Sequence, residues 1–178
     1  MELYCIISIT DRIAAADVLG ICRDLGLSFT LTNLGRGTAT SEHLTLNNLE
    51  HSEKAVVSVF AGAAEMKRLI HLAKAVMFMD IPGNGIMMAI PVKSVGGAKT
   101  LAFLTAGKDS EGGVPDMKFE HELIVVVLNE GYADVVMDAA RAAGASGGTV
   151  LHAKGTGNKD AVRFFGVSLA EEKDMIYI

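Results

Sequence analysis

Two short polar segments hold the residue types best suited to bind an anion. Each carries a basic residue, a glycine and a threonine in that order: the first segment is Gly35, Arg36, Gly37 and Thr38, and the second is Lys154, Gly155 and Thr156. Glycine lets the backbone turn tightly and bring its N–H groups close to a ligand. The basic side chain and the hydroxyl add hydrogen bonds. The pattern predicts binding of an anionic group such as a phosphate; the alternative is a pair of solvated turns.

A second glycine motif, Pro82-Gly83-Asn84-Gly85, predicts a turn just before an apolar strand. We expect Gly83 and Gly85 to belong to the same ligand site as the first segment. Neither motif matches the Gly-x-x-x-x-Gly-Lys-Ser/Thr phosphate loop, so the prediction depends on glycine and positive charge together.

The chain shows no standard catalytic or metal-binding pattern. It has no Gly-x-Ser-x-Gly motif, no cysteine with an evident partner histidine and no evident pair of catalytic carboxylates. His43 and His51 lie among glutamates, but their spacing matches no standard zinc site, and solvated loop histidines are the better interpretation. We therefore expect a protein that is not an enzyme and that has no catalytic residue, no metal and no tightly bound cofactor.

The elements that must position these residues follow from apolar periodicity. Thr10 or Asp11 is suited to cap the first helix, and Gly26 to end it in the left-handed conformation. The predicted elements are a strand at Leu3–Ile9, a helix up to Gly26, strands at Phe29–Leu34 and Lys54–Phe60, a helix at Ala63–Met77 and a strand at Ile86–Val92. On that second helix the predicted apolar face comprises Met66, Leu69, Ile70, Ala73, Val76 and Met77. The order βαββαβ predicts an α+β domain of the ferredoxin-like type over residues 1–92.

Residues 93–120 are rich in glycine and are predicted to form a linker, with Leu101–Leu104 as a candidate extra strand. A second domain is predicted over residues 121–178. Its elements are strands at Leu123–Leu128, Thr149–Ala153 and Lys173–Ile178 and a helix whose apolar face comprises Tyr132, Val136, Ala139, Ala140 and Ala143. This βαββ order matches only part of the first domain.

The two domains share an internal repeat. Ten positions separate Gly26 from Arg36, and ten separate Gly144 from Lys154, so the two basic-Gly-Thr segments align without a gap. With one gap, Glu53-Lys54 aligns with Glu172-Lys173. We interpret the chain as a duplicated fold with an incomplete second copy. An incomplete sheet exposes apolar surface, and this favours a homo-oligomer.

Composition limits the function classes. Half of the 178 residues are apolar and the formal net charge is −5, which excludes a disordered chain and argues against a nucleic-acid partner. The apolar runs are too short to cross a bilayer, and the start of the chain does not resemble a signal peptide. Cys5 and Cys22 lie in apolar runs and are expected to be buried free thiols, which indicates a cytoplasmic protein.

Three features together resemble the PII nitrogen-regulatory signal proteins. These are the βαββαβ order, the basic glycine segment Gly35-Arg36-Gly37 after the second strand, and the segment Pro82–Val92, which is similar to the family's Gly-Asp-Gly-Lys-Ile-Phe-Val signature and following Pro-Val. The second domain is most similar to the divergent PII-like branch. Ile86 stands where the family signature has a lysine that contacts phosphate, and this favours a ligand less charged than a triphosphate.

The resemblance implies a metabolite-sensing regulator. PII proteins form trimers of ferredoxin-like subunits and bind adenine nucleotides, often with 2-oxoglutarate, in clefts between subunits. We thus expect a signal protein that binds ATP, ADP or AMP as a regulatory effector between repeats or subunits. Its target would be a transporter, a channel or a metabolic enzyme in nitrogen or carbon metabolism. The alternatives are a small ferredoxin-like phosphate-ester hydrolase and a trimeric metal-binding module.

Overall fold

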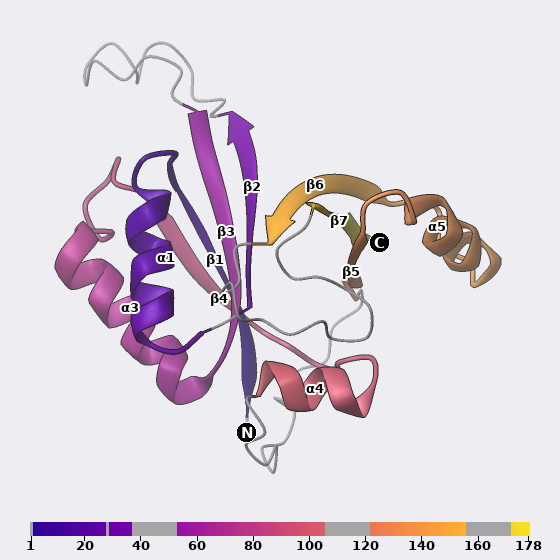
Figure 1. The fold of residues 1–178 in the computed structure, drawn as a ribbon, viewed down its shortest axis with the longest axis horizontal. Helices are drawn as coiled ribbons and strands as arrows, with labels where there is room; N and C mark the ends of the chain where they lie inside the picture. Colours follow the sequence, from indigo (N-terminus) through magenta and orange to yellow (C-terminus); the bar gives the residue numbers. More distant parts are fainter. Residues whose placement is uncertain (1, 28, 37–52, 106–121, 156–171) are drawn as a thin grey trace. The chain divides into compact units, whose positions relative to one another are not determined.

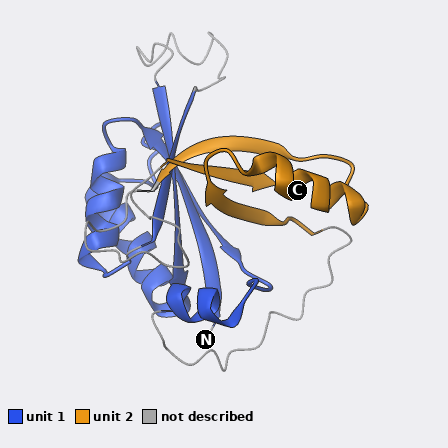
Figure 2. Ribbon diagram, turned by 45° about the vertical axis from the view of Figure 1, so that its right-hand side comes forward, with its two compact units in different colours: residues 1–115 blue, residues 116–178 orange. Residues whose placement is uncertain are grey.

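The computed structural model describes residues 2–27, 29–36, 53–105, 122–155 and 172–178 (Figure 1). The chain divides into two compact units, Met1–Pro115 and Asp116–Ile178 (Figure 2). The division falls inside the segment 93–120 that the sequence predicts to be a linker.

Unit 1 is a mixed α+β unit built on an antiparallel sheet. Its elements are β1 (Leu3–Asp11), α1 (Ala15–Asp24), β2 (Thr30–Arg36), β3 (Glu53–Gly62), α3 (Ala63–Met77), β4 (Ile86–Pro91) and α4 (Ala98–Leu104). The four strands lie in the order β4-β1-β3-β2, and every neighbouring pair is antiparallel. This arrangement is compatible with the predicted ferredoxin-like fold.

Helices α1 and α3 cover one face of this sheet (Figure 1). The core between them includes Ile6 from β1, Val57 and Val59 from β3, Val18 from α1 and Leu69 from α3, all nearly inaccessible to solvent. Because side chains alternate across a strand, neighbours of these residues point to the opposite face. There Ile86, Met88 and Ile90 of β4 lie opposite β1 and remain exposed.

The start of α1 differs from the prediction. Thr10 and Asp11 do not cap the helix, because the ladder with β3 continues to the Asp11–Lys54 pair and keeps both residues in β1. The helix begins at Ala15 without a side-chain cap. Its end is confirmed: Gly26 has φ +72°, and the N–H groups of Gly26 and Leu27 donate to the carbonyl groups of Arg23 and Cys22 at 2.9 and 2.8 Å. This is a Schellman motif, which needs a left-handed residue.

Helix α3 has the predicted bounds but a narrower buried stripe. Leu69 and Ala73 are buried, and Met66 and Met77 pack against the core. Ile70 and Val76, predicted to share that face, are 38% and 61% exposed. The sheet contacts only part of the helix surface, so these two flanking apolar side chains stay outside the core.

The extra strand predicted at Leu101–Leu104 is wrong, because this run belongs to helix α4. Gly97, with φ +88°, precedes the helix, and its carbonyl accepts the first bond from the Leu101 N–H at 3.1 Å. The Phe103 ring then meets the Phe29 ring edge-on, with centroids 6.0 Å apart. A four-residue apolar run fits a strand and a short helix equally well, and here tertiary packing decides.

Unit 2 repeats the first part of this order. Its elements are β5 (Val125–Asn129), α5 (Ala133–Ala142), β6 (Thr149–Gly155) and β7 (Glu172–Tyr177). Strand β7 pairs antiparallel with both β5 and β6. Helix α5 ends as α1 does: Gly144 has φ +100°, and the N–H groups of Gly144 and Ala145 donate to the carbonyl groups of Arg141 and Ala140 at 3.0 and 2.9 Å.

The apolar face predicted for α5 is partly wrong. Tyr132, Ala139 and Ala143 are exposed, whereas the buried side chain is that of Met137. A Cβ atom on Gly148 would lie 2.8 Å from the Met137 sulfur, so this glycine leaves room for the methionine. The alanine-rich sequence gave no indication of which stripe faces the strands.

Both cysteines are free thiols; Cys22 is buried and Cys5 is partly buried. Burial raises the pKa of each thiol to about 11, because a thiolate is poorly solvated there. Among the described residues, no helix is long and apolar enough to cross a membrane.

Candidate functional site

The sequence predicts a loop at Gly35 and Arg36, and this prediction is wrong. The two residues are instead the last two of β2. Gly35 pairs with Lys54 and Arg36 with Glu53, because the β2–β3 ladder continues to the start of β3. Gly37 and Thr38 lie outside the described residues.

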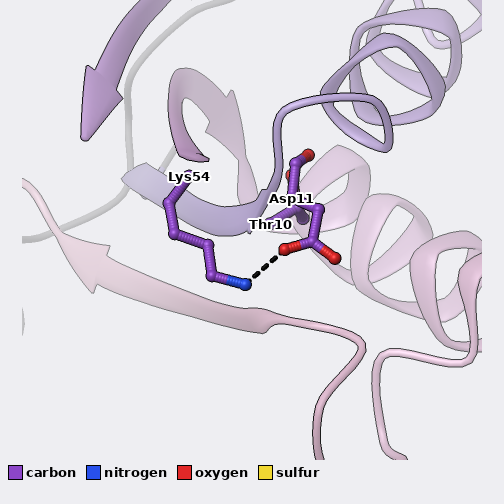
Figure 3. A network of polar contacts seen from close by, with 3 residues as sticks. All are labelled: Thr10, Asp11 and Lys54. Carbon is purple, nitrogen blue, oxygen red and sulfur yellow. Dashed lines mark hydrogen bonds and ion pairs between the residues drawn. The ribbon is translucent and has the colours of Figure 1, made fainter. Parts of the chain in front are cut away.

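The same end of the sheet carries two ion pairs that join Asp11, the last residue of β1, and Arg12, which follows it, to β3. The Lys54 ammonium donates to the Asp11 carboxylate (Figure 3). Next to it, Arg12 Nη1 lies 2.5 Å from Glu53 Oε2, and both side chains are more than half exposed. We call Asp11, Arg12, Arg36, Glu53 and Lys54 the unit 1 ionic cluster. Its exposed ion pairs contribute little to stability, because water screens them, and their side chains can rearrange around a ligand.

The glycine turn reaches this end from β4. Gly83 and Gly85 have φ values of +103° and +134°, which confirms the predicted turn. A Cβ atom on Gly85 would lie 2.7 Å from the Ile9 carbonyl oxygen and 3.1 Å from Thr10 Cγ2, so close packing against β1 requires glycine there. A Cβ atom on Gly83 would meet nothing, and only its φ favours glycine. The structure therefore brings Gly35, Arg36 and Gly85 to one end of the unit 1 sheet.

In unit 2, Lys154 and Gly155 likewise end strand β6 rather than forming the predicted loop. Lys154 pairs with Glu172, the first residue of β7. Thr156 lies outside the described residues. On the other side of β7, Lys173 pairs with Asn129, and its Nζ donates to Asn129 Oδ1 at 2.6 Å. We call Asn129, Glu130, Lys154, Glu172 and Lys173 the unit 2 ionic cluster.

The two clusters occupy corresponding positions. A shift of 118 residues relates Asp11 to Asn129, Arg12 to Glu130 and Arg36 to Lys154, and a shift of 119 relates Glu53-Lys54 to Glu172-Lys173. The strand partners correspond as well: Arg36 pairs with Glu53 as Lys154 pairs with Glu172, and Lys54 donates to Asp11 as Lys173 donates to Asn129.

The sign of the charge is reversed at one corresponding position. Where Arg12 forms an ion pair with Glu53, Glu130 faces Glu172. The hydrogen bond to Glu172 raises the pKa of Glu130, and the negative charges of Glu172 and Asp174 add to this effect.

Beside this cluster lies a polar pair that was not predicted from the sequence, formed by a buried aspartate and an exposed histidine. His152 Nδ1 lies 2.9 Å from Asp174 Oδ1, and the Gly131 N–H donates to Asp174 Oδ2 at 3.0 Å. The Asp174 side chain is 4% exposed and that of His152 is 80% exposed. The available signal was the strand register, because pairing Lys154 with Glu172 also sets His152 opposite Asp174.

No metal centre is formed by the residues that the structure describes: no group of three or more His, Cys, Asp or Glu side chains is placed to hold an ion. His43 and His51, the histidines weighed as ligands from the sequence, lie outside the described residues.

Comparisons with known proteins give weak structural similarities. No family model matches the chain, and no curated protein does. Among solved structures, it is similar to B. subtilis GlnK in complex with ATP (14% identity, TM-score 0.37, 51% of this chain and 82% of that one) and to B. subtilis GlnK (15% identity, TM-score 0.35, 52% and 86%). It is also similar to a Bacillus cereus protein related to NIF3, at 13% identity and TM-score 0.37; the alignment covers 97% of this chain but only 38% of that protein. Similarities at this level define neither a family nor a function.

Proposed function

We propose that this chain is a non-enzymatic regulatory protein that binds an adenine nucleotide or a related anionic metabolite and controls a partner protein. Its ligand site is the end of the unit 1 sheet, formed by Gly35, Arg36, Lys54 and the Gly83–Gly85 turn. Gly37 and Thr38 are proposed to continue the site along the chain.

The observation that carries this proposal is that glycine and positive charge lie at the same end of the sheet, from the turn before β4 across to β2. Strand β2 brings Gly35 and Arg36 there, β3 brings Lys54, and the turn before β4 brings Gly85 against the end of β1. Glycine backbone and basic side chains are the groups that hold phosphate when no phosphate loop is present.

We also propose that units 1 and 2 are two copies of one βαββ element. Three observations support this: the shift of 118 or 119 residues between corresponding positions, the Schellman motifs at Gly26 and Gly144, and the matching Lys54–Asp11 and Lys173–Asn129 contacts. In this interpretation α3 and β4 complete only the first copy.

A homo-oligomer is part of the proposal. Ile86, Met88 and Ile90 form an exposed apolar row on β4, and a second copy of the chain would cover such a row. Analytical ultracentrifugation tests this: Met88→Lys is expected to lower the association state, and Lys67→Ala on exposed α3 is the control. A monomeric wild-type chain would contradict it.

Isothermal titration of nucleotide-free protein with ATP, ADP and AMP, each with and without 2-oxoglutarate, tests the binding function. We expect micromolar affinity, about −8 kcal/mol, for at least one nucleotide. Arg36→Ala should weaken it about tenfold or more by removing a charge-assisted hydrogen bond. Lys67→Ala, which removes a distant exposed charge, should not. Absence of heat with every nucleotide would contradict the proposal, and so would equal affinity of wild type and Arg36→Ala.

Phosphate-ester hydrolysis is a second candidate, favoured by the His152–Asp174 pair. A buried carboxylate that fixes one imidazole nitrogen leaves the other oriented toward solvent, as a general base requires. Assay of a generic phosphate ester with wild type and His152→Ala distinguishes the candidates. Turnover that His152→Ala abolishes would establish the enzyme; no turnover is expected.

A further inference from the structure

We infer that each chain binds one anionic ligand, and that it binds at unit 1. At the corresponding end of unit 2, Glu130 and Asp174 repel an anion. This inference rests on the proposed function and narrows it. Sequence similarity of the two basic-Gly-Thr segments alone predicts two equivalent sites.

The backbone frame does not distinguish the two ends. In both units a basic residue closes the second strand opposite the first glutamate of the third strand, at Arg36–Glu53 and at Lys154–Glu172. In both, the next lysine of that third strand donates to the end of the first strand. On these shared strands the two ends differ in the side chains that they carry, and unit 1 further has the Gly83–Gly85 turn beside β1.

The unit 1 ionic cluster carries an excess of positive charge. By residue type it has three basic residues, Arg12, Arg36 and Lys54, and two acidic ones, Asp11 and Glu53. The Arg12–Glu53 pair is more than half exposed, so Arg12 can exchange its carboxylate partner for a ligand phosphate at little energetic cost.

At the unit 2 end the excess is negative. Glu130 replaces Arg12, and Asp174 stands where unit 1 has Ala55. Together with Glu172, they bring the number of carboxyl groups to three, whereas the basic residues number two, Lys154 and Lys173. The proton affinity of Glu130 is already raised by its neighbours, and a phosphate placed here would add like charge to a crowded site.

Lys173, the second basic residue of the unit 2 ionic cluster, is also inaccessible to a ligand. Lys173 is 2% exposed, and its ammonium is engaged with Asn129. Lys54 in unit 1 is partly exposed. A ligand at the unit 2 end would therefore meet Lys154 as its one accessible lysine among the described residues of this cluster, beside Glu130 and Glu172.

The test is the stoichiometry of nucleotide binding by the full chain, titrated with ADP by calorimetry. We expect one ADP per chain. Arg36→Ala and the charge reversal Arg12→Glu should each weaken binding about tenfold or more, whereas Lys154→Ala should change the affinity less than about twofold. Glu130→Arg restores the unit 1 pattern in unit 2, and we expect it to add a second, weaker binding event.

Each result has one meaning. Two ADP molecules per wild-type chain, or a loss with Lys154→Ala as large as that with Arg36→Ala, overturns this inference and leaves the proposed function standing. No heat with wild type overturns the proposed function and this inference with it. Arg12 and Glu130 are exposed, so both charge reversals should fold; circular dichroism and thermal melting verify this.

Discussion

One end of the unit 1 sheet carries two ion pairs, Arg12–Glu53 and Lys54–Asp11. The corresponding end of unit 2 carries two neighbouring carboxyl groups, those of Glu130 and Glu172. Arg12 and Glu53 attract each other, whereas the hydrogen bond and the negative charge of Glu172 raise the pKa of Glu130. The strand register is the same in both units. The register therefore fixes where a side chain stands, and we propose that the changes of charge at Glu130 and Asp174 decide what binds there.

The lysines of the two clusters differ in exposure and in the charge of their partner. Lys54 is partly exposed and paired with a charged Asp11, but Lys173 is buried and bonded to the neutral amide of Asn129. A surface ion pair is worth little, whereas a buried donor and acceptor are costly to separate. The unit 1 lysine is therefore suited to ligand binding and the unit 2 lysine to structure.

The largest expected effect comes from removing that buried lysine. Lys173→Ala should lower the free energy of unfolding by about 2–4 kcal/mol, because it leaves a cavity and an unpaired Asn129 amide. The matched Lys54→Ala should lower it by less than about 1 kcal/mol. Urea denaturation measures both, and equal losses would contradict the distinction between the two lysines.

A smaller, equal effect is expected at the two helix ends. Gly26→Ala and Gly144→Ala each place a Cβ atom on a residue with positive φ, and each should cost about 1 kcal/mol. Thermal melting of the single variants tests whether the two units correspond. A loss at one glycine without a loss at the other would argue against corresponding Schellman motifs.

The smallest effects should have opposite signs. Since the native state holds the pKa of Glu130 above its unfolded value, the native state binds more protons, and stability falls as pH rises through that raised pKa. Glu130→Gln removes this loss and should raise the melting temperature near pH 7 but not near pH 4. Glu53→Gln instead breaks an ion pair and should lower it slightly. Melting curves at both pH values test this; a lower melting temperature for Glu130→Gln at pH 7 would contradict it.

Sequence periodicity predicted the long elements well. The bounds of α3 and the left-handed Gly26 follow from an amphipathic stripe and a helix-ending glycine, which are local signals. The interpretation failed where tertiary contacts decide. Strand pairing drew Thr10 and Asp11 into β1, and packing of Phe103 on Phe29 made Leu101–Leu104 helical.

The candidate site shows the same limit. Gly35, Arg36 and Gly85 could be selected from residue type, but their position at the same end of the sheet depends on the strand order and the register of its strands. Asp174 escaped notice because it follows Glu172 and Lys173 in the charged first half of β7, and its partners His152 and Gly131 are far away in sequence. Local patterns carry no information on such pairs until the register is known.

The most direct test of the central claim is a backbone amide NMR titration of ¹⁵N-labelled protein with ADP. The account predicts saturable shift changes at the amides of Gly35, Arg36 and Gly85, with those of Lys154 and Gly155 unchanged at the same ADP concentrations. Equal changes at both sets, or changes confined to Lys154 and Gly155, would contradict it.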